Sequence, residues 1–292
     1  MTDLPGTPEV AGADIVAGLR QLGLSAGDGV IVHSSLKSVG HVAGGAPTVI
    51  ATLQEVLTPV GTLVLPTFNQ GRAFRDGAEG FFDPRTTAVS TGLIAQTFWQ
   101  LPDVPRSLNP THAFAAWGRN AERYIRYHHR TLTVGPDSPL GLLGREGGYG
   151  LLLGVDYRAN TFHHVVEVTT GAPCLGLRTC ALPVCLPDGR MVMGRTWSWR
   201  ERPCPIDDAA RYAPIMAERG LQRQTTIGAA TATLFRLSDC FAVIAELLAN
   251  GLGEFPPCRR CPIRPGVNRH TVVSDWDDQR QCLKPDAEAW TY

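Results

Sequence analysis

The sequence has few of the features that direct a protein to a membrane or to a polyanion. No run of about 18 consecutive apolar residues, the length that a membrane span requires, occurs in its 292 residues. The N-terminal segment has neither the charged nor the apolar region of a signal peptide. Basic and acidic side chains number 27 each, so the composition offers no basic surface for nucleic acid. We therefore expect a cytoplasmic protein that binds neither nucleic acid nor a membrane.

Three common catalytic and nucleotide-binding motifs are also missing. The patterns G-x-x-x-x-G-K-[ST] and G-x-G-x-x-G do not occur, so neither a nucleoside triphosphate nor a nicotinamide cofactor is indicated. The elbow G-x-S-x-G is absent as well, because Ser138 in "GPDSPLG" stands one position away from it. A serine hydrolase is therefore disfavoured.

The sequence contains eight cysteines. In a reducing compartment their spacing favours buried thiols and a metal site over a framework of disulfides. Cys258 and Cys261 of "CRRC" form a C-x-x-C pair, which is half of a structural zinc site. A buried thiol pair or a redox pair would have the same spacing. The remaining zinc ligands would be Cys204 and one of Cys240, His270 and Cys282.

Hydrophobic patterning predicts an α/β fold. The β-branched runs 29–36 and 61–68 flank a helical pattern at 46–57, and such a strand–helix–strand unit is typical of a parallel sheet. Apolar runs at 113–118 and 149–155 predict two further strands. Helices are expected at 14–24, at 90–101 with Ser90 or Thr91 as the cap, and at 238–251.

The pattern changes at 177–199, where two alternating runs are joined by "PDG". This arrangement predicts a β-hairpin. We therefore expect a central, mainly parallel sheet flanked by helices, with an embedded antiparallel portion.

The segment 151–170 holds the main candidates for proton transfer. If Asn160 caps a helix, His164 lies four residues further on and Glu167 three beyond that, so all three share one face. A neutral imidazole oriented by a carboxylate is the usual general base near pH 7. On spacing alone a solvated His–Glu pair is the stronger interpretation, and His163 is expected about 100° away around the helix.

Two further segments carry polar residues at the ends of predicted elements. Ser34, Ser35 and Lys37 follow a strand and precede a helix, where backbone N–H groups could hold a phosphate. Asp83 in "FFDP" is an isolated acid. Taken singly, each segment is also compatible with an ordinary turn.

Five segments, in this order, resemble the aminoglycoside 3-N-acetyltransferase family. They are 32–69, "FFDP" at 81–84, "RSLNPTHAFAAWG" at 106–118, "GPDSPLGLL" at 135–143 and "LLLGVDYRANTFHHVVE" at 151–167. The resemblance covers 14–170 and becomes thin over 171–292. It implies the antibiotic N-acetyltransferase fold, which is unlike the GNAT fold. It also implies acetyl-CoA as cofactor and direct transfer to a primary amine of a small molecule, without an acetyl-enzyme.

The sequence contains no internal repeat and no low-complexity linker, so a single domain is expected. A single acetyltransferase domain would span 1–292. Its core motifs would occupy 14–170, a substrate-side hairpin and helices 171–252, and a C-terminal wrap containing cysteines 253–292.

The family's motif N-T-x-x-H-x-x-E matches Asn160, Thr161, His164 and Glu167. The resemblance thus implies that His164 takes the proton from the attacking amine, and that Asp83 orients the imidazole or receives the amine. Expected coenzyme A contacts are Ser34, Ser35, Leu36, Lys37, Ser107 and Ser138. Expected substrate contacts are Asn160, Asp83, Glu167 and Arg200. The C-x-x-C pair also resembles that of some relatives, which supports zinc.

The acceptor amine is not identified by these motifs. A polycationic aminoglycoside calls for carboxylates, whereas "GRTWSWRERPC" carries Arg195, Arg200 and Arg202 beside Trp197 and Trp199, a set that suits an anionic or planar acceptor. These arginines are equally compatible with the surface of a hairpin. The acceptor is therefore an aminoglycoside, with antibiotic resistance as the outcome, or an amine in a biosynthetic intermediate. The motifs also leave room for a non-catalytic coenzyme A-binding module, for an acyl-CoA hydrolase and for a homodimer.

Overall fold

The computed structural model describes residues 9–170, 178–198 and 211–249, and two short strands at 276–277 and 282–283. Of the predicted site residues, Arg200, Cys204, Cys258 and Cys261 lie outside the described residues.

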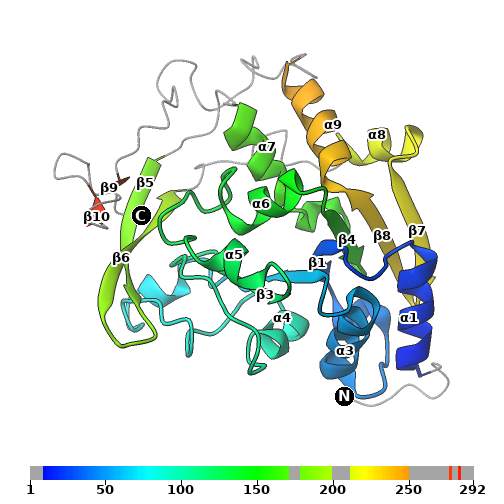
Figure 1. The fold of residues 1–292 in the computed structure, drawn as a ribbon, viewed down its shortest axis with the longest axis horizontal. Coiled ribbons are helices and arrows are strands. Elements are labelled where there is room, and N and C mark those ends of the chain that lie inside the picture. The colour runs from blue at the N-terminus through cyan, green and yellow to red at the C-terminus, as the bar shows by residue number, and fades with distance from the viewer. Residues whose placement is uncertain (1–8, 171–177, 199–210, 250–275, 278–281, 284–292) are drawn as a thin grey trace.

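Ten strands and nine α-helices make up the described part of the chain (Figure 1). The strands are β1 (Gly29–Ser34), β2 (Thr62–Pro66), β3 (Phe114–Gly118), β4 (Tyr149–Leu153), β5 (Arg178–Cys185), β6 (Met191–Ser198), β7 (Gln222–Ile227), β8 (Ala230–Arg236), β9 (Trp276–Asp277) and β10 (Cys282–Leu283). The helices are α1 (Gly12–Gln21), α2 (Leu36–Val39), α3 (Gly45–Leu57), α4 (Leu93–Phe98), α5 (Ala121–Ile125), α6 (Pro139–Arg145), α7 (Phe162–Thr170), α8 (Ala213–Glu218) and α9 (Leu237–Ala249). Two 3-10 turns occupy Arg72–Phe74 and Tyr157–Ala159.

The central sheet has six strands in the order β3-β2-β1-β4-β8-β7. Its middle strands β2, β1 and β4 are parallel, whereas β3, β8 and β7 pair antiparallel to their neighbours. Every residue of β2 and β4 is buried, as expected for strands with helices on both faces. The predicted α/β class with an antiparallel portion is confirmed.

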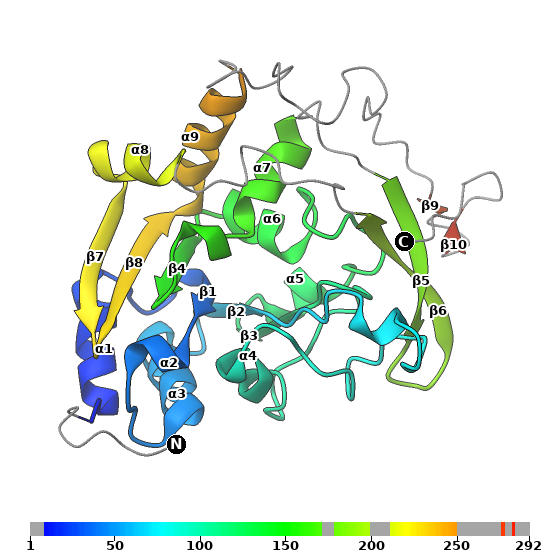
Figure 2. The same ribbon diagram turned by 180° about the vertical axis from the view of Figure 1, so that it is seen from behind.

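Helices cover both faces of this sheet (Figures 1 and 2). Alternation along β1 sends Val30 and Val32 to one face, where they pack with α1, α3 and α4. Ile31 points to the other face and packs with α5 to α9. The second face carries the segments that form the candidate site.

The predicted hairpin is confirmed as β5 and β6, which pair with each other from Arg178–Ser198 to Cys185–Met191. It lies at the end of the molecule away from α1 and β7 (Figures 1 and 2). Phe82 attaches it to the rest of the fold, because the Phe82 N–H donates to Pro183 O (2.9 Å) and the Cys185 N–H donates to Phe82 O (2.8 Å). The antiparallel portion therefore consists of this separate hairpin and the outer strands of the sheet.

One predicted helix cap is wrong. The N-cap of α4 is Gly92, which makes no side-chain capping bond. Ser90 and Thr91 instead donate their hydroxyls to Phe68 O (3.0 Å) and Pro66 O (2.6 Å). These hydrogen bonds direct both hydroxyls to the end of β2 and the residues just after it, and away from the N–H groups of the helix. Among the described helices, none has the length and apolarity needed to cross a bilayer.

Candidate active site

The start of α7 is built by the segment that follows β4. Asn160 is 1% exposed, and its Oδ1 accepts a hydrogen bond (3.2 Å) from the N–H of Phe162, the first residue of α7. Its amide nitrogen faces Tyr212 Oη and Cys240 Sγ, each at 3.5 Å. Both ends of the amide therefore face protein. The observed role of Asn160 is to fix the first turn of α7, and its substrate contact stays a prediction.

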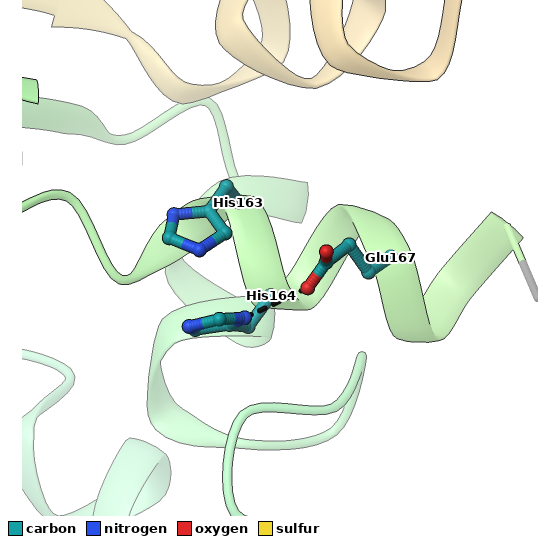
Figure 3. A group of neighbouring side chains, drawn as sticks. All are labelled: His163, His164 and Glu167. Atoms are coloured by element: carbon teal, nitrogen blue, oxygen red, sulfur yellow. Dashed lines mark hydrogen bonds and ion pairs between the residues drawn. The ribbon is translucent and has the colours of Figure 1, made fainter. Parts of the chain in front are cut away.

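His164 and Glu167 form a buried pair on α7 (Figure 3). His164 Nδ1 and Glu167 Oε2 are 2.7 Å apart, and the side chains are 7% and 0% exposed. The solvated pair favoured by spacing alone is therefore wrong. Because an ionised carboxylate can only accept, Nδ1 is the donor of this hydrogen bond, and Nε2 is the ring nitrogen turned away from the carboxylate. An imidazole held in this orientation can act as a base through Nε2.

His163 lies beside His164 instead of pointing to a different neighbour. The two ring centroids are 3.7 Å apart at an interplanar angle of 52°, and Figure 3 shows both rings on the same side of α7. His163 Nδ1 lies 2.5 Å from Asn160 O, which draws the ring back over the first turn of the helix. The sequence prediction of separated rings is therefore wrong, since it used helix geometry without this hydrogen bond.

Two further histidines, from other parts of the chain, complete this region. His33 at the end of β1 places Nε2 3.5 Å from Thr161 Oγ1, and His112 packs on the Phe68 ring at 4.8 Å. Burial, followed by the proximity of His163, lowers the pKa of His33 to about 4. Burial, followed by the proximity of His164, lowers the pKa of His112 to about 3. Both imidazoles are therefore neutral near pH 7.

Sequence reasoning missed His33 and His112. Both stand inside segments that carried a family resemblance, "HSSL" and "NPTHAF". The signal that could have found them is the presence of a histidine in each of three motifs.

The predicted coenzyme A segment lies at the junction of β1 and α2. Ser35 caps α2, with Oγ accepting from the Ser38 N–H (3.3 Å), while Leu36 is partly buried and Lys37 is exposed. Ser34, the last residue of β1, is also partly buried. The contacts of these residues with a cofactor stay predictions.

A cavity of about 700 Å³ adjoins this segment. It is lined by Ser35, Ser38, Gly154, Val155, Asp156, Arg158, Ala159, Ala229, Ala230 and Thr231. A Cβ on Gly154 would come within 2.7 Å of Ser38 Cβ, so glycine lets α2 approach the end of β4. Hydroxyls, backbone and the ion pair of Arg158 with Asp156 (2.6 Å) thus line this space.

Ser107 and Ser138 are enclosed by protein. Ser107 Oγ lies 2.8 Å from His128 Nδ1 and accepts from the Phe114 N–H (2.9 Å). Ser138 Oγ donates to Gly135 O (2.6 Å) and caps α6. With 1% and 0% exposure, both serines have structural roles in this conformation, and their coenzyme A contacts stay predictions.

Asp83 is held by Arg85, whose Nε and Nη2 donate to its two oxygens at 3.0 and 2.9 Å. The hydrogen bonds from Arg85 lower the pKa of the Asp83 carboxyl below its usual value. Because Glu167 occupies His164 Nδ1, the orienting carboxylate in this structure is Glu167 and not Asp83. A contact between Asp83 and the amine stays a prediction.

A second cavity, of about 680 Å³, lies beside the end of α7 and contains two arginines. It is lined by Tyr127, Arg130, Thr131, Leu132, Gly135, Pro136, Asp137, Val168, Thr169 and Arg195. Asp137 pairs with Arg145 (3.1 Å), which offsets its charge. Arg130 and Arg195 are therefore the two cationic side chains among the described lining residues. Arg195, a predicted candidate, lines it and is 6% exposed.

Of the cysteines considered as zinc ligands, Cys240 is described in full. It lies on α9 as a buried free thiol, and burial raises its pKa to about 12. Such a thiol resists ionisation, whereas zinc binds the thiolate. Cys240 therefore belongs to the core, and a zinc site at Cys258 and Cys261 stays a prediction.

Comparison with known proteins identifies the family. The family model described as aminoglycoside 3-N-acetyltransferase matches residues 31–249. An aminoglycoside N(3)-acetyltransferase IV of Salmonella sp. is 33% identical over 268 residues, which cover 90% of this chain and 96% of the relative.

Solved structures agree with this assignment. The crystal structure of a histidine-to-alanine variant of aminoglycoside acetyltransferase AAC(3)-IVa in complex with a gentamicin matches with a TM-score of 0.71 and 31% identity, covering 88% of this chain and 97% of that one. A structure described as AAC-IIIb binary with CoASH matches with a TM-score of 0.72 and 25% identity, covering 83% and 97%. This chain therefore belongs to the aminoglycoside 3-N-acetyltransferase family, and it is an N-acetyltransferase.

Proposed function

We propose that this protein transfers the acetyl group of acetyl-CoA directly to a primary amine of a small molecule, with His164 as the general base. The observation that carries the proposal is the buried pair of His164 and Glu167, in which the carboxylate holds Nδ1 at 2.7 Å and so fixes the orientation of the ring. A coenzyme A complex of one relative supports the choice of cofactor. The match of the family model to 31–249 supports a single catalytic domain.

The residues of α7 would act during attack of the amine. Acetyl-CoA, when bound, supplies the acetyl group as a thioester. His164 Nε2 accepts the proton that the amine nitrogen loses as its bond to the acetyl carbon forms. The imidazolium that results is stabilised by Glu167, in the way that a buried aspartate stabilises the histidine of a catalytic triad. The same proton can then pass to the departing sulfur, so the base is regenerated.

The segment at β1 and α2 would hold the cofactor. Ser34, Ser35, Leu36 and Lys37 are proposed to contact it where the 700 Å³ cavity opens beside Ser35. Ser35 and Lys37 offer a hydroxyl and a cation, both of which suit phosphate. Asp83 is the proposed contact for the amine.

The first candidate acceptor is an aminoglycoside. The names of the relatives and the gentamicin complex of AAC(3)-IVa support it. With wild-type protein, acetyl-CoA and gentamicin, we expect an acetylated product by mass spectrometry and one thiol released per product. Thiol release that does not depend on an amine would indicate a hydrolase. Coenzyme A binding without turnover of any amine would indicate a binding module.

The second candidate acceptor carries an anionic group. The cavity beside α7 favours it. Arg130 and Arg195 line this cavity together with Val168, the residue that follows Glu167. Guanidinium groups suit a phosphate or carboxylate. Glucosamine and glucosamine 6-phosphate differ only in the phosphate, so their kcat/KM ratio tests this candidate. A ratio that favours the phosphate ester and falls at least about tenfold in Arg130→Gln supports it. A ratio near one, with turnover of gentamicin, excludes it.

A further inference from the structure

Arg85 occupies both oxygens of the Asp83 carboxylate. The Arg85 N–H donates to Oδ1 (2.8 Å), and the guanidinium donates to Oδ1 through Nε (3.0 Å) and to Oδ2 through Nη2 (2.9 Å). A guanidinium that meets both oxygens of a carboxylate forms a strong and well-oriented ion pair. The charge of Asp83 is therefore balanced at contact distance within the protein itself.

The β5–β6 hairpin holds Arg85 in this position. Arg85 Nη1 donates to Pro187 O (3.1 Å), in the turn between the two strands, and Nη2 lies 3.4 Å from Cys185 Sγ at the end of β5. The guanidinium thus bridges the carboxylate and the hairpin. Arg106 is a second cation near this carboxylate, and its charge adds to the effect of the Arg85 hydrogen bonds in lowering the pKa of Asp83.

The same local arrangement recurs in the hairpin turn, where it is far more exposed. The Arg190 N–H donates to Asp188 Oδ1 (3.1 Å), and Nε donates to Oδ2 (2.7 Å). The side chain of Asp188 is 52% exposed, whereas that of Asp83 is 10% exposed. Water and salt screen a buried charge less than an exposed one. The balance of charge at Asp83 therefore matters more to a nearby ligand than the balance at Asp188.

The Asp83 segment also lies near the candidate base. Phe82 packs with Ala113, which directly follows His112. His112 is in turn close enough to His164 for the two rings to interact electrostatically. An acceptor that reaches His164 would therefore approach the pair of Asp83 and Arg85.

We propose that Arg85 is a specificity-determining residue, which lowers the affinity of this protein for polycationic acceptors by neutralising Asp83. The inference rests on the proposed function, in which Asp83 contacts the amine of the acceptor. A carboxylate without a cationic partner attracts a polycation, whereas a neutral pair offers it no net charge. Replacing Arg85 by a neutral residue should therefore strengthen the binding of gentamicin, a gain that damage to the fold would not produce.

The test is the Kd of gentamicin, measured by calorimetry in the presence of coenzyme A. The wild-type pair and the double variant Asp83→Asn, Arg85→Gln are neutral, Arg85→Gln leaves a negative charge, and Asp83→Asn leaves a positive one. We expect Arg85→Gln to bind at least about threefold more tightly than wild type, Asp83→Asn at least about threefold more weakly, and the double variant like wild type. Both differences should shrink between about 0.05 and 0.5 M NaCl, because salt screens charge.

Two control variants separate local charge from other effects. Arg190→Gln removes the same charge from the exposed pair and should leave the Kd unchanged. Arg85→Lys keeps the cation but not the contact with both oxygens, so it should gain less affinity than Arg85→Gln. The inference is overturned if Arg85→Gln binds gentamicin no more tightly than wild type, or if either control gains as much as Arg85→Gln. If the wild-type protein acetylates no amine, the proposed function fails, while these dissociation constants still decide the role of Arg85.

Discussion

Glu167 has no exposed surface, so its charge must be compensated inside the protein. The hydrogen bond to His164 Nδ1 supplies part of that compensation and leaves the imidazole in one orientation. Glu167→Gln keeps the size of the side chain and an acceptor for Nδ1–H, but it removes the charge that stabilises an imidazolium. We expect kcat to fall about 10²-fold or more with coenzyme A binding retained.

The matched control for this prediction is Glu246→Gln. Glu246 lies on α9 and forms an ion pair with Arg219, and both side chains are about half exposed. The same substitution there should leave kcat unchanged. Calorimetry with coenzyme A and steady-state kinetics check both variants. A Glu167→Gln protein with wild-type kcat would contradict the role given to the carboxylate.

At the level of single residues, the shared face of His164 and Glu167 could be predicted because helix periodicity alone determines it. Their burial could not, because it depends on elements far away in the chain. His163 was placed wrongly for a local reason: its Nδ1 bonds to the Asn160 carbonyl, and a helical projection does not include that hydrogen bond.

Among the elements, β4 tolerates little change because β8 lies against it. A Cβ on Gly150 would come within 2.3 Å of the Phe235 ring. We expect Gly150→Ala to lower the free energy of unfolding by about 1–3 kcal/mol, the usual cost of overpacking. Denaturant melts measure it. Gly12→Ala at the start of α1, where the nearest atom would be 3.3 Å away, is the control and should change stability by much less. Equal effects at both positions would contradict the packing argument.

Element types were largely predictable, since continuous apolar runs gave β4 and helical periodicity gave α3 and α9. The cap of α4 could not be predicted, because the hydroxyls of Ser90 and Thr91 donate to carbonyls of Phe68 and Pro66, which only the tertiary structure brings near them. The order of strands β4-β8-β7 could likewise not be predicted from the sequence, because antiparallel pairing to a parallel core depends on long-range contacts.

Across the whole molecule, buried neutral histidines make stability depend on pH. The pKa of His33 is lowered to about 4, and those of His112 and His128 to about 3, in each case mainly by burial. Below about pH 6.5 the unfolded chain binds protons that the folded protein does not, so stability falls as the pH drops toward 4. Each such histidine contributes at most about 1.4 kcal/mol per pH unit.

Thermal melts between pH 7 and 4 check this expectation. We expect Tm to fall steadily through that window, and His128→Gln to flatten the dependence relative to wild type. The control His41→Gln, at a histidine whose side chain is 61% exposed, should leave the slope as it is. A Tm that is constant over this range would show that the three rings take up protons while the protein is folded.

The four imidazoles come from three separate stretches of chain: His33 from β1, His112 from the loop before β3, and His163 and His164 from α7. Cutting the chain in the turn at 119–120 would leave two of these rings on each piece. Neither piece alone would then acetylate an amine, and a mixture would do so only after the pieces reassemble. The protein is thus a natural starting point for a split reporter, in which product formation records the joining of two fused partners.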